Sequence, residues 1–407
     1  MDEHELIEGA NRFLHRLCVE IPTRRVGSDG NREATDFFIE TISGFGFSSV
    51  CLEFDCFDWE HGEVSLTVEG SSFEAFASPY SLGCDLHAQL EAACSLAELD
   101  ALDLDGKIVL LYGEIAKGQL MPKDFPFFYP EEHKQIIDIL ETKKLDAIIA
   151  ATGRDPGMAG AMHPFNLFED GNFNIPSVYM TDAEGERLYK FLHQEVTLMS
   201  EASRIPSTGC NPVARRGKEL NKRIVLTAHI DAKIGTPGAI DNAGGVVTLL
   251  TVANLLQDYK GTLTVELVAF NGEDYYSAPG QIAYIRKYAS TFPEILLAVN
   301  LDGLGYVEGK TATSLYNCPT GVTEIAEKVF ASHNEFVQGD SWYQSDHSIF
   351  IQNKVPAMAI TTDQFSEVWA GIAHTEKDTP DIVDTSKLVR TAQGLRDLIL
   401  ELDKQNE

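Results

Sequence analysis

The chain has 407 residues, of which 44% are hydrophobic and 23% are charged. This composition suggests a globular protein of roughly two domains. Acidic residues number 62 and basic residues 32, so the formal net charge is −30. Such a field repels phosphate backbones and excludes nucleic acid as an expected partner. It fits cationic or neutral small substrates, or a surface that is merely well solvated. No run of about 18 apolar residues occurs, so no membrane partner is expected.

The N-terminal residues and the cysteines bear on the compartment. The first five residues are acidic and lack the basic and apolar parts of a signal sequence, so a cytoplasmic protein is expected if this is the native start, with a processed secreted form as the alternative. The seven cysteines are an odd number, are scattered, and include no CxxC pair. We therefore expect reduced, mostly buried thiols and neither a disulfide framework nor a thiolate zinc site.

The first part of the chain alternates between helix and strand signals. Apolar residues at helical spacing predict helices over 4–18 and 31–44, and a loosely alternating pattern predicts a strand over 49–59. Residues 62–192 then show short strands and turns with few helices. A β-rich block with α/β neighbours on both sides is typical of an inserted domain. Within it we predict strands at 105–113, 147–151 and 175–181, and helices at 131–144 and 183–193.

After two further strands near 195–203 and 211–216, a strong α/β alternation begins. It predicts strands at 223–229, 262–271, 295–301 and 356–361, and helices near 242–258, 278–288, 320–333 and 386–402. The predicted fold class is α/β, a three-layer domain whose mixed, mostly parallel sheet is flanked by helices, with a β-rich (α+β) insertion. The predicted domains are residues 1–61 with 193–407, and the insertion 62–192.

The loop that follows the strand at 223–229 carries His229, Asp231 and Asp241. Ligands bind at the carboxyl ends of strands in open α/β sheets, so this loop is a candidate site. His229 and Asp231 are two positions apart and point to the same face while the chain is extended. Asp241 precedes a helical run, where it is expected as the N-cap. Taken alone, the loop is explained equally well by a buried histidine and a helix cap.

The other strong strands end in similar residues. Glu273 and Asp274 follow the second strand, Asp302 follows the third, and His374 lies beyond the fourth. Gathered at one sheet edge, two histidines and several carboxylates form the mixed nitrogen and oxygen donor set that suits zinc. Carboxylates packed this closely repel one another, and a divalent ion removes that repulsion. The pattern therefore predicts a metal site.

The motifs also follow a fixed order along the chain. They are H-x-D at His229, G-A-x-D-N-A-G-G around Asp241, N-G-E-D around Glu273, N-L-D ending at Asp302, S-D-H, V-P-A, and H-T-x-x-D-T-P-D beginning at His374. This set resembles the co-catalytic two-zinc exopeptidases, which include bacterial leucyl aminopeptidases and glutamate carboxypeptidases. The resemblance covers about 1–60 and 195–407. Within the insertion, 105–111 and 175–180 resemble a protease-associated domain.

The resemblance implies a role for each of these residues. Asp241 would bridge two divalent ions, most simply Zn²⁺ with Co²⁺ or Mn²⁺ as alternatives. His229 and Asp302 would complete the first site, and Asp274 and His374 the second. The family often has a cis peptide after the bridging aspartate. Asp231 would accept the second ring N–H of His229 and so fix its tautomer.

Glu273 would act as the general base on a water that bridges the metals. The family usually has Glu-Glu where this chain has Glu273-Asp274, and aspartate is shorter by one methylene group. A weaker or differently coordinated second ion is one interpretation of this difference, and a backbone adjustment is another. A third assigns Glu273 as the ligand and leaves no base. Tyr343, Asp346 and His347 are further candidates for contact with substrate.

The small number of arginines indicates which end of a peptide substrate is attacked. A carboxypeptidase needs an arginine to anchor the substrate carboxylate, and Arg286 is the one arginine between Ile224 and Val389. Arg24, Arg25 and Arg204 could still reach the site. We therefore expect a metallo-aminopeptidase that acts on peptides with a free N-terminus, and the sequence leaves assembly as a homo-oligomer open. Alternatives are a glutaminyl cyclase-like enzyme, a carboxypeptidase and a non-catalytic binding homologue.

Overall fold

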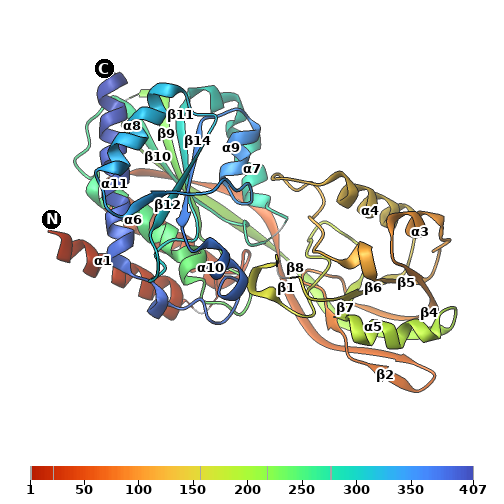
Figure 1. Ribbon diagram of the computed structural model, residues 1–407. Helices are drawn as coiled ribbons and strands as arrows, with labels where there is room; N and C mark the ends of the chain where they lie inside the picture. The colour runs from red at the N-terminus through yellow and green to blue at the C-terminus, as the bar shows by residue number, and fades with distance from the viewer. Residues whose placement is uncertain (1, 22, 156, 218, 276, 407) are drawn as a thin grey trace. The chain divides into compact units, whose positions relative to one another are not determined.

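The chain divides into two units, whose helices and strands are labelled in Figure 1. The first unit comprises Met1–Asp55, Pro126–Phe128 and Thr208–Glu407, and the second comprises Cys56–Phe125 and Tyr129–Ser207. The computed structural model describes residues 2–21, 23–155, 157–217, 219–275 and 277–406, without the side chains of 219–221. The second unit extends beyond the predicted 62–192 at both ends, because the chain passes between the units within two long strands, β1 (Ser48–Val68) and β8 (Glu195–Arg216).

The first unit is built on a mixed sheet with the strand order β13-β12-β14-β11-β9-β10-β8. The central strands β9, β10, β11 and β14 are parallel to their neighbours within this group, whereas β8 pairs antiparallel with β10 and β12 pairs antiparallel with β14. This is the mixed, mostly parallel sheet predicted. The strands are β9 (Glu219–His229), β10 (Leu263–Phe270), β11 (Ile295–Leu301), β12 (Thr311–Tyr316), β13 (Phe336–Gln338) and β14 (Ala357–Thr362).

Helices cover both faces of this sheet, and the alternation of side chains along the strands explains the two cores. Leu267 and Ala269 of β10 join the large apolar core under α6 (Gly244–Leu255), which is buried along most of its length. Around α6 lie α1 (Glu3–His15), α2 (Asp29–Gly44), α8 (Thr320–Ala331) and α11 (Thr385–Asn406). Phe270 points the other way, toward aromatic residues of α7 (Pro279–Tyr288), the 3₁₀ turn Ala289–Glu294 and α9 (His347–Gln352).

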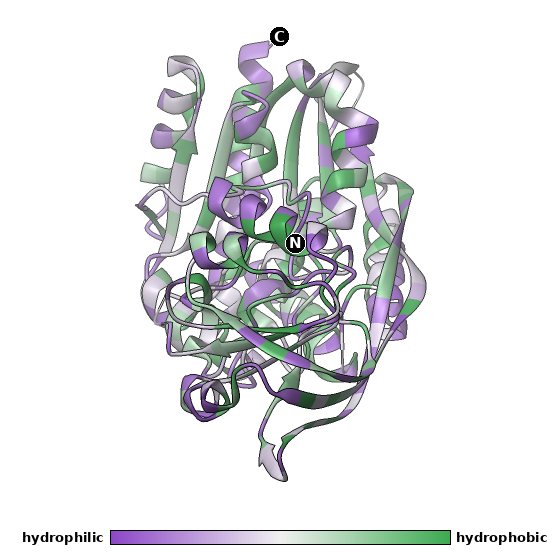
Figure 2. Cartoon of the chain, turned by 90° about the vertical axis from the view of Figure 1, so that its right-hand side faces the viewer, coloured by the Kyte–Doolittle hydropathy of each residue, from purple (hydrophilic) through white to green (hydrophobic). Residues whose placement is uncertain are grey.

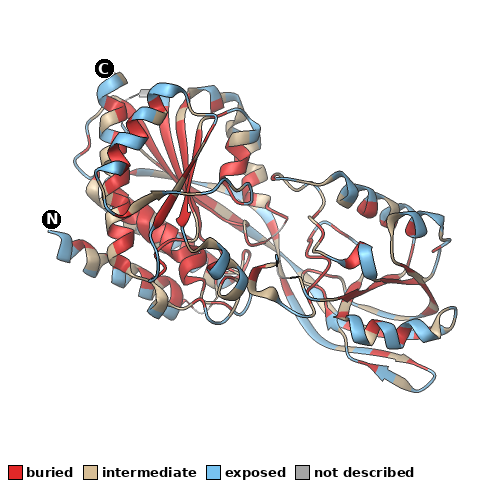
Figure 3. Ribbon diagram, viewed as in Figure 1, coloured by how far each residue is buried: buried red, intermediate tan, exposed pale blue. Residues whose placement is uncertain are grey.

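The distribution of side chains follows from this layering. Hydrophobic residues line the central strands, while hydrophilic residues lie on the outer faces of the surrounding helices (Figure 2). The strands of the first unit are buried and its helices are exposed on one side (Figure 3). The α/β fold class is confirmed. Within the described residues, no helix is both long and apolar enough to cross a bilayer.

In the second unit the strand order is β8-β4-β5-β6-β7-β3, with β4 to β7 parallel. Alternate residues of β5 face two separate cores: Val109 and Leu111 face one, and Ile108 and Leu110 the other. Its elements are β2 (Ser71–Phe73), β3 (Phe76–Ala77), β4 (Cys84–Ala93), α3 (Leu96–Ala101), β5 (Ile108–Leu111), α4 (Glu131–Thr142), β6 (Ala147–Thr152), β7 (Ser177–Thr181) and α5 (Asp182–Leu188).

Two expectations are wrong. The strands predicted at 195–203 and 211–216 are one strand, β8, because the turn-like residues between them stay extended. Cys51 and Cys210 form a disulfide with their Cα atoms 5.6 Å apart, although we expected reduced thiols. No local spacing marks a pair 159 positions apart; the pairing of β1 with β8 creates it. The other five cysteines are not part of a disulfide: Cys18, Cys56, Cys84, Cys94 and Cys318.

Candidate metal centre

Three neighbouring strands bring the candidate residues to one sheet edge. β9 lies between β10 and β11, and its last residue, His229, pairs with Phe270 at the end of β10. Glu273 and Asp274 follow the turn after β10. Asp302 follows β11, and its N–H donates to the carbonyl oxygen of Ile360 on β14. Adjacent parallel strands end at the same edge, so residues far apart in the sequence meet here.

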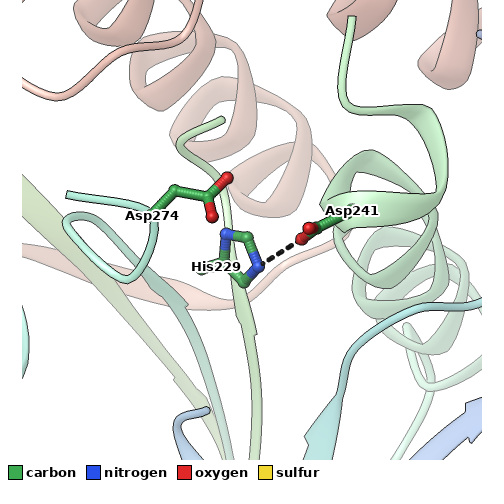
Figure 4. Close-up of side chains that lie close together, drawn as sticks. All are labelled: His229, Asp241 and Asp274. Atoms are coloured by element: carbon green, nitrogen blue, oxygen red, sulfur yellow. Dashed lines mark ion pairs between the residues drawn. The ribbon is translucent and has the colours of Figure 1, made fainter. Parts of the chain in front are cut away.

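Asp241 lies between the two histidines. One carboxylate oxygen, Oδ1, is 3.0 Å from Nε2 of His229, and the other, Oδ2, is 3.2 Å from Nε2 of His374. Figure 4 shows the contact between His229 and Asp241, with Asp274 on a third segment nearby. The peptide bond between Asp241 and Asn242 is cis, as the resemblance implied. A carboxylate placed with one oxygen toward each imidazole has the geometry of a bridging group.

Asp241 does not cap the following helix, which corrects the expectation. It lies within the irregular turn Ala239–Ala243, and α6 begins at Gly244. The side chain of Asn242 supplies the missing acceptor instead, because its Oδ1 accepts the N–H of Gly245 at 3.1 Å. Asp241 is therefore left free to face the histidines.

Three further carboxylates border the two imidazoles. Oδ1 of Asp274 lies 3.0 Å from Nε2 of His374, and Oδ1 of Asp302 lies 3.5 Å from Nε2 of His229. Oε2 of Glu273 is farther, at 4.0 Å from the same atom of His229. One ligand atom each from His229, Asp241 and Asp274 lies within 4.8 Å of the other two. These distances place Asp274 among the atoms that could hold an ion.

The protein atoms leave part of this cluster unsatisfied. Nε2 of His229 is buried and has no hydrogen-bond partner of acceptable geometry among the described residues. Burial alone would lower the pKa of His229, but the carboxylates of Asp302 and Asp241 outweigh it and raise that pKa well above its usual value. Burial, together with Asp302 and Asp274, raises the pKa of Glu273 well above its usual range. A divalent cation would supply the positive charge that these carboxylates lack, so the donor set fits a metal.

Asp231 does not make the contact predicted for it. Nδ1 of His229 lies 3.1 Å from the backbone oxygen of Asp231 but 3.8 Å from its carboxylate. The carboxylate instead accepts the backbone N–H groups of Glu273 at 3.4 Å and Asp274 at 3.1 Å. Asp231 thus orients the imidazole through its main chain and holds the neighbouring loop through its side chain.

Motif reasoning did not assign a role to Ser345 beside Asp302. The Ser345 hydroxyl donates to Oδ2 of Asp302 at 2.5 Å and accepts from the amide of Asn300 at 2.9 Å. Ser345 is the first residue of the S-D-H motif. The motif marked this segment as close to the site, but Asp346 and His347 were the residues predicted to act there. The contact leaves Oδ1 of Asp302 facing His229.

The candidate substrate residues lie in different environments. Asp346 is fully buried and accepts from Gln281 at 2.8 Å, and burial raises its pKa to about 7. His347 is also fully buried; its ring packs on Trp342, and burial lowers its pKa to about 4. Tyr343 is 51% exposed. Of these three, Tyr343 is the one that solvent reaches, whereas Asp346 and His347 lie beneath the surface.

Comparison with solved structures bears on the fold. An aminopeptidase from Aneurinibacillus sp. strain AM-1 superposes with a TM-score of 0.75 at 20% identity, over 98% of this chain and 96% of that one. A zinc aminopeptidase from Bacillus subtilis superposes with a TM-score of 0.71 at 19% identity, over 97% and 94%. These likenesses establish a shared α/β fold.

A family model and a curated relative match the sequence itself. Residues 211–399 match the model of Peptidase family M28, which confirms the resemblance predicted from the motifs. The chain is also similar to leucine aminopeptidase 2 of Arthroderma otae, at 24% identity over 96% of this chain and 82% of that protein. The matched segment contains every residue of the candidate metal centre.

Proposed function

We propose that the protein is a metal-dependent aminopeptidase that hydrolyses the first peptide bond of peptides with a free N-terminus. One observation carries the proposal: a single carboxylate, that of Asp241, is shared by two buried imidazoles at 3.0 and 3.2 Å. The match to Peptidase family M28 and the similarity to a leucine aminopeptidase support it.

In this proposal Asp241 bridges two ions, with His229 and Asp302 at the first and Asp274 and His374 at the second. Zinc is the proposed metal, because the donors are nitrogen and oxygen and the similar Bacillus subtilis protein is a zinc aminopeptidase. When bound, the ions would polarise the scissile carbonyl group and make a water molecule more acidic.

Glu273 performs the proton transfers in this proposal. Its side chain is 16% exposed, against 1% for His229, so solvent and substrate can approach it. Its carboxylate takes a proton as the water oxygen attacks the carbonyl carbon. It returns that proton to the amine nitrogen as the carbon–nitrogen bond breaks. We also propose that the second unit is an insertion of the protease-associated type.

The arginines support attack at the amino end. The guanidinium of Arg24 is bound by backbone oxygens of Leu17 and Ile230, among others, and that of Arg204 by the backbone oxygens of Tyr80 and Phe173. Arg286 is exposed on α7. Arg24 and Arg204 are therefore engaged elsewhere and do not offer a substrate carboxylate the bidentate contact it needs.

The test is a panel of aminoacyl chromogenic substrates and blocked peptides, assayed on metal-free protein reconstituted with Zn²⁺, Co²⁺ or Mn²⁺. Glu273→Gln should retain the metals and lose turnover by at least about a thousandfold, since removing the base removes both proton transfers. Glu376→Gln, at an exposed position two residues after His374, is the matched control and should stay active. Turnover that survives in Glu273→Gln would show that another group is the base.

The same panel separates the alternatives. Release of the C-terminal residue from N-blocked peptides identifies a carboxypeptidase. Cyclisation of N-terminal glutamine with one bound ion per chain identifies a glutaminyl cyclase-like enzyme. Metal binding without turnover of any substrate identifies a non-catalytic homologue.

A further inference from the structure

A buried arginine from the N-terminal segment reaches the loop that joins two of the candidate ligands. Arg24 is 2% exposed and donates four hydrogen bonds, all to backbone oxygens. Nε donates to Ile230 at 2.9 Å, Nη1 to Leu17 at 2.7 Å and Pro237 at 2.8 Å, and Nη2 to Gly238 at 2.8 Å. These hydrogen bonds of the guanidinium thus all go to the main chain.

Three of the four acceptors, all except Leu17, lie at the two ends of one loop. Ile230 directly follows His229, and Gly238 comes three residues before Asp241. A guanidinium is a planar fork of fixed geometry, so its simultaneous bonds to both ends hold them at one separation. The carbonyl oxygen of Gly238 also accepts the N–H of Ala243 at 2.9 Å, which ties the fork to the turn that contains Asp241.

The turn is held from another direction by Asp378. This residue is fully buried, and its two carboxylate oxygens accept the N–H groups of Ile240 at 2.7 Å and Asp241 at 3.0 Å. The backbone of Asp241 is therefore held between a buried guanidinium and a buried carboxylate. The two groups come from segments more than 350 positions apart in the sequence.

We propose that Arg24 is a positioning residue for the metal centre: by fixing the loop between His229 and Asp241, it sets the affinity of the first metal position. The inference rests on the proposed function, because that function requires the ions. Groups that orient metal ligands typically contribute about 10–100-fold in metal affinity. Lysine keeps the charge but has one nitrogen, which does not reach acceptors at both ends of the loop.

The experiment compares Arg24→Lys with Arg223→Lys. Arg223 is 3% exposed and bonds Glu294 and Thr291, and it lies near the opposite end of β9 from His229. Metal-free proteins are titrated with Zn²⁺ in competition with a chromophoric chelator, and their melting temperatures are measured without and with Zn²⁺. Visible spectra of the Co²⁺-loaded forms report the geometry of the site.

Arg24→Lys should bind Zn²⁺ at least about tenfold more weakly, gain less thermal stability from it, and show an altered Co²⁺ spectrum. Arg223→Lys should lose stability while its Zn²⁺ affinity and Co²⁺ spectrum stay those of the wild type. Equal affinity and spectra in Arg24→Lys and the wild type would overturn the inference. A wild-type protein that binds no divalent ion would instead overturn the proposed function.

If Arg24→Lys does not fold, a second variant tests the same inference. Gly238→Ala leaves Arg24 in place, but a Cβ atom there would lie 2.8 Å from Nη2 of Arg24 and 2.6 Å from the carbonyl oxygen of Asp241. It should shift the same loop and weaken Zn²⁺ binding to a similar degree. Unchanged Zn²⁺ affinity in Gly238→Ala would overturn the inference.

Discussion

Lys387 offers a quantitative test of how the loop after Asp302 is held. It lies on α11 and is 8% exposed, and its ammonium nitrogen lies within hydrogen-bond distance of four successive backbone oxygens, which share its three N–H groups. These belong to Tyr306, Val307, Glu308 and Gly309, at 2.7, 3.0, 3.1 and 2.8 Å. Methionine keeps an unbranched stem as far as Cε and removes every donor, so Lys387→Met separates these bonds from the packing of the stem.

The expected cost follows from the burial of these groups. A hydrogen bond to a charged group contributes about 1.5–3 kcal/mol, and each buried acceptor left unpaired costs about 1–3 kcal/mol. Water can reach part of this loop, so we expect Lys387→Met to lower the free energy of unfolding by about 3–5 kcal/mol. Urea denaturation of the metal-free protein measures this change.

A matched control is available in the second unit. Lys143 also donates to backbone oxygens, those of Asp100 at 2.7 Å and Leu102 at 2.6 Å, but it is half-exposed. Because water can replace its ammonium group, Lys143→Met should cost about 1 kcal/mol or less. A cost for Lys387→Met that is no larger than that of the control would refute the reasoning from buried carbonyl groups.

Three more predictions concern the site and the cysteines. Thiol titration in denaturant should find five reactive thiols before reduction and seven after it, because Cys51 and Cys210 are paired; seven from the start would contradict the disulfide. Ser345→Ala removes the hydroxyl that donates to Asp302 and should weaken Zn²⁺ binding about tenfold in a competition titration; unchanged affinity would mean that the contact does not orient the ligand. Chelation should abolish hydrolysis and lower the melting temperature, and Zn²⁺ should restore both, since Nε2 of His229 is otherwise buried without a hydrogen bond of acceptable geometry among the described residues; full activity after complete removal of metal would disprove a metal-dependent mechanism.

The sequence predicted those parts of the fold that depend on local pattern. The strong strands β9, β10, β11 and β14 are where apolar runs placed them, and parallel strands bring their carboxyl ends together, so the ligand cluster followed from the motifs. The short strands β12 and β13 and the helix α10 (Phe365–Gly371) escaped detection, since three to seven residues carry too little periodicity.

The supporting contacts of the site could not be predicted for a different reason. Arg24, Lys387 and Asp378 bind main-chain atoms, and every residue has a main chain. Such contacts leave no complementary side chain for a motif to reveal. Their targets are set by how distant segments pack, which the sequence alone does not show.

The position of Asp274 illustrates how contacts to the main chain affect the candidate metal centre. The resemblance implies a glutamate here, and for the shorter aspartate we expected either a weaker or differently coordinated second ion or an adjustment of the backbone. The carboxylate of Asp231 binds the N–H groups of Glu273 and Asp274 and so holds this loop beside the end of β9. From there Oδ1 of Asp274 lies 3.0 Å from His374, while Oδ2 accepts the N–H of Lys233 at 3.1 Å. Asp274 thus reaches His374 despite its shorter side chain, which leaves Glu273 for the role of base that we propose.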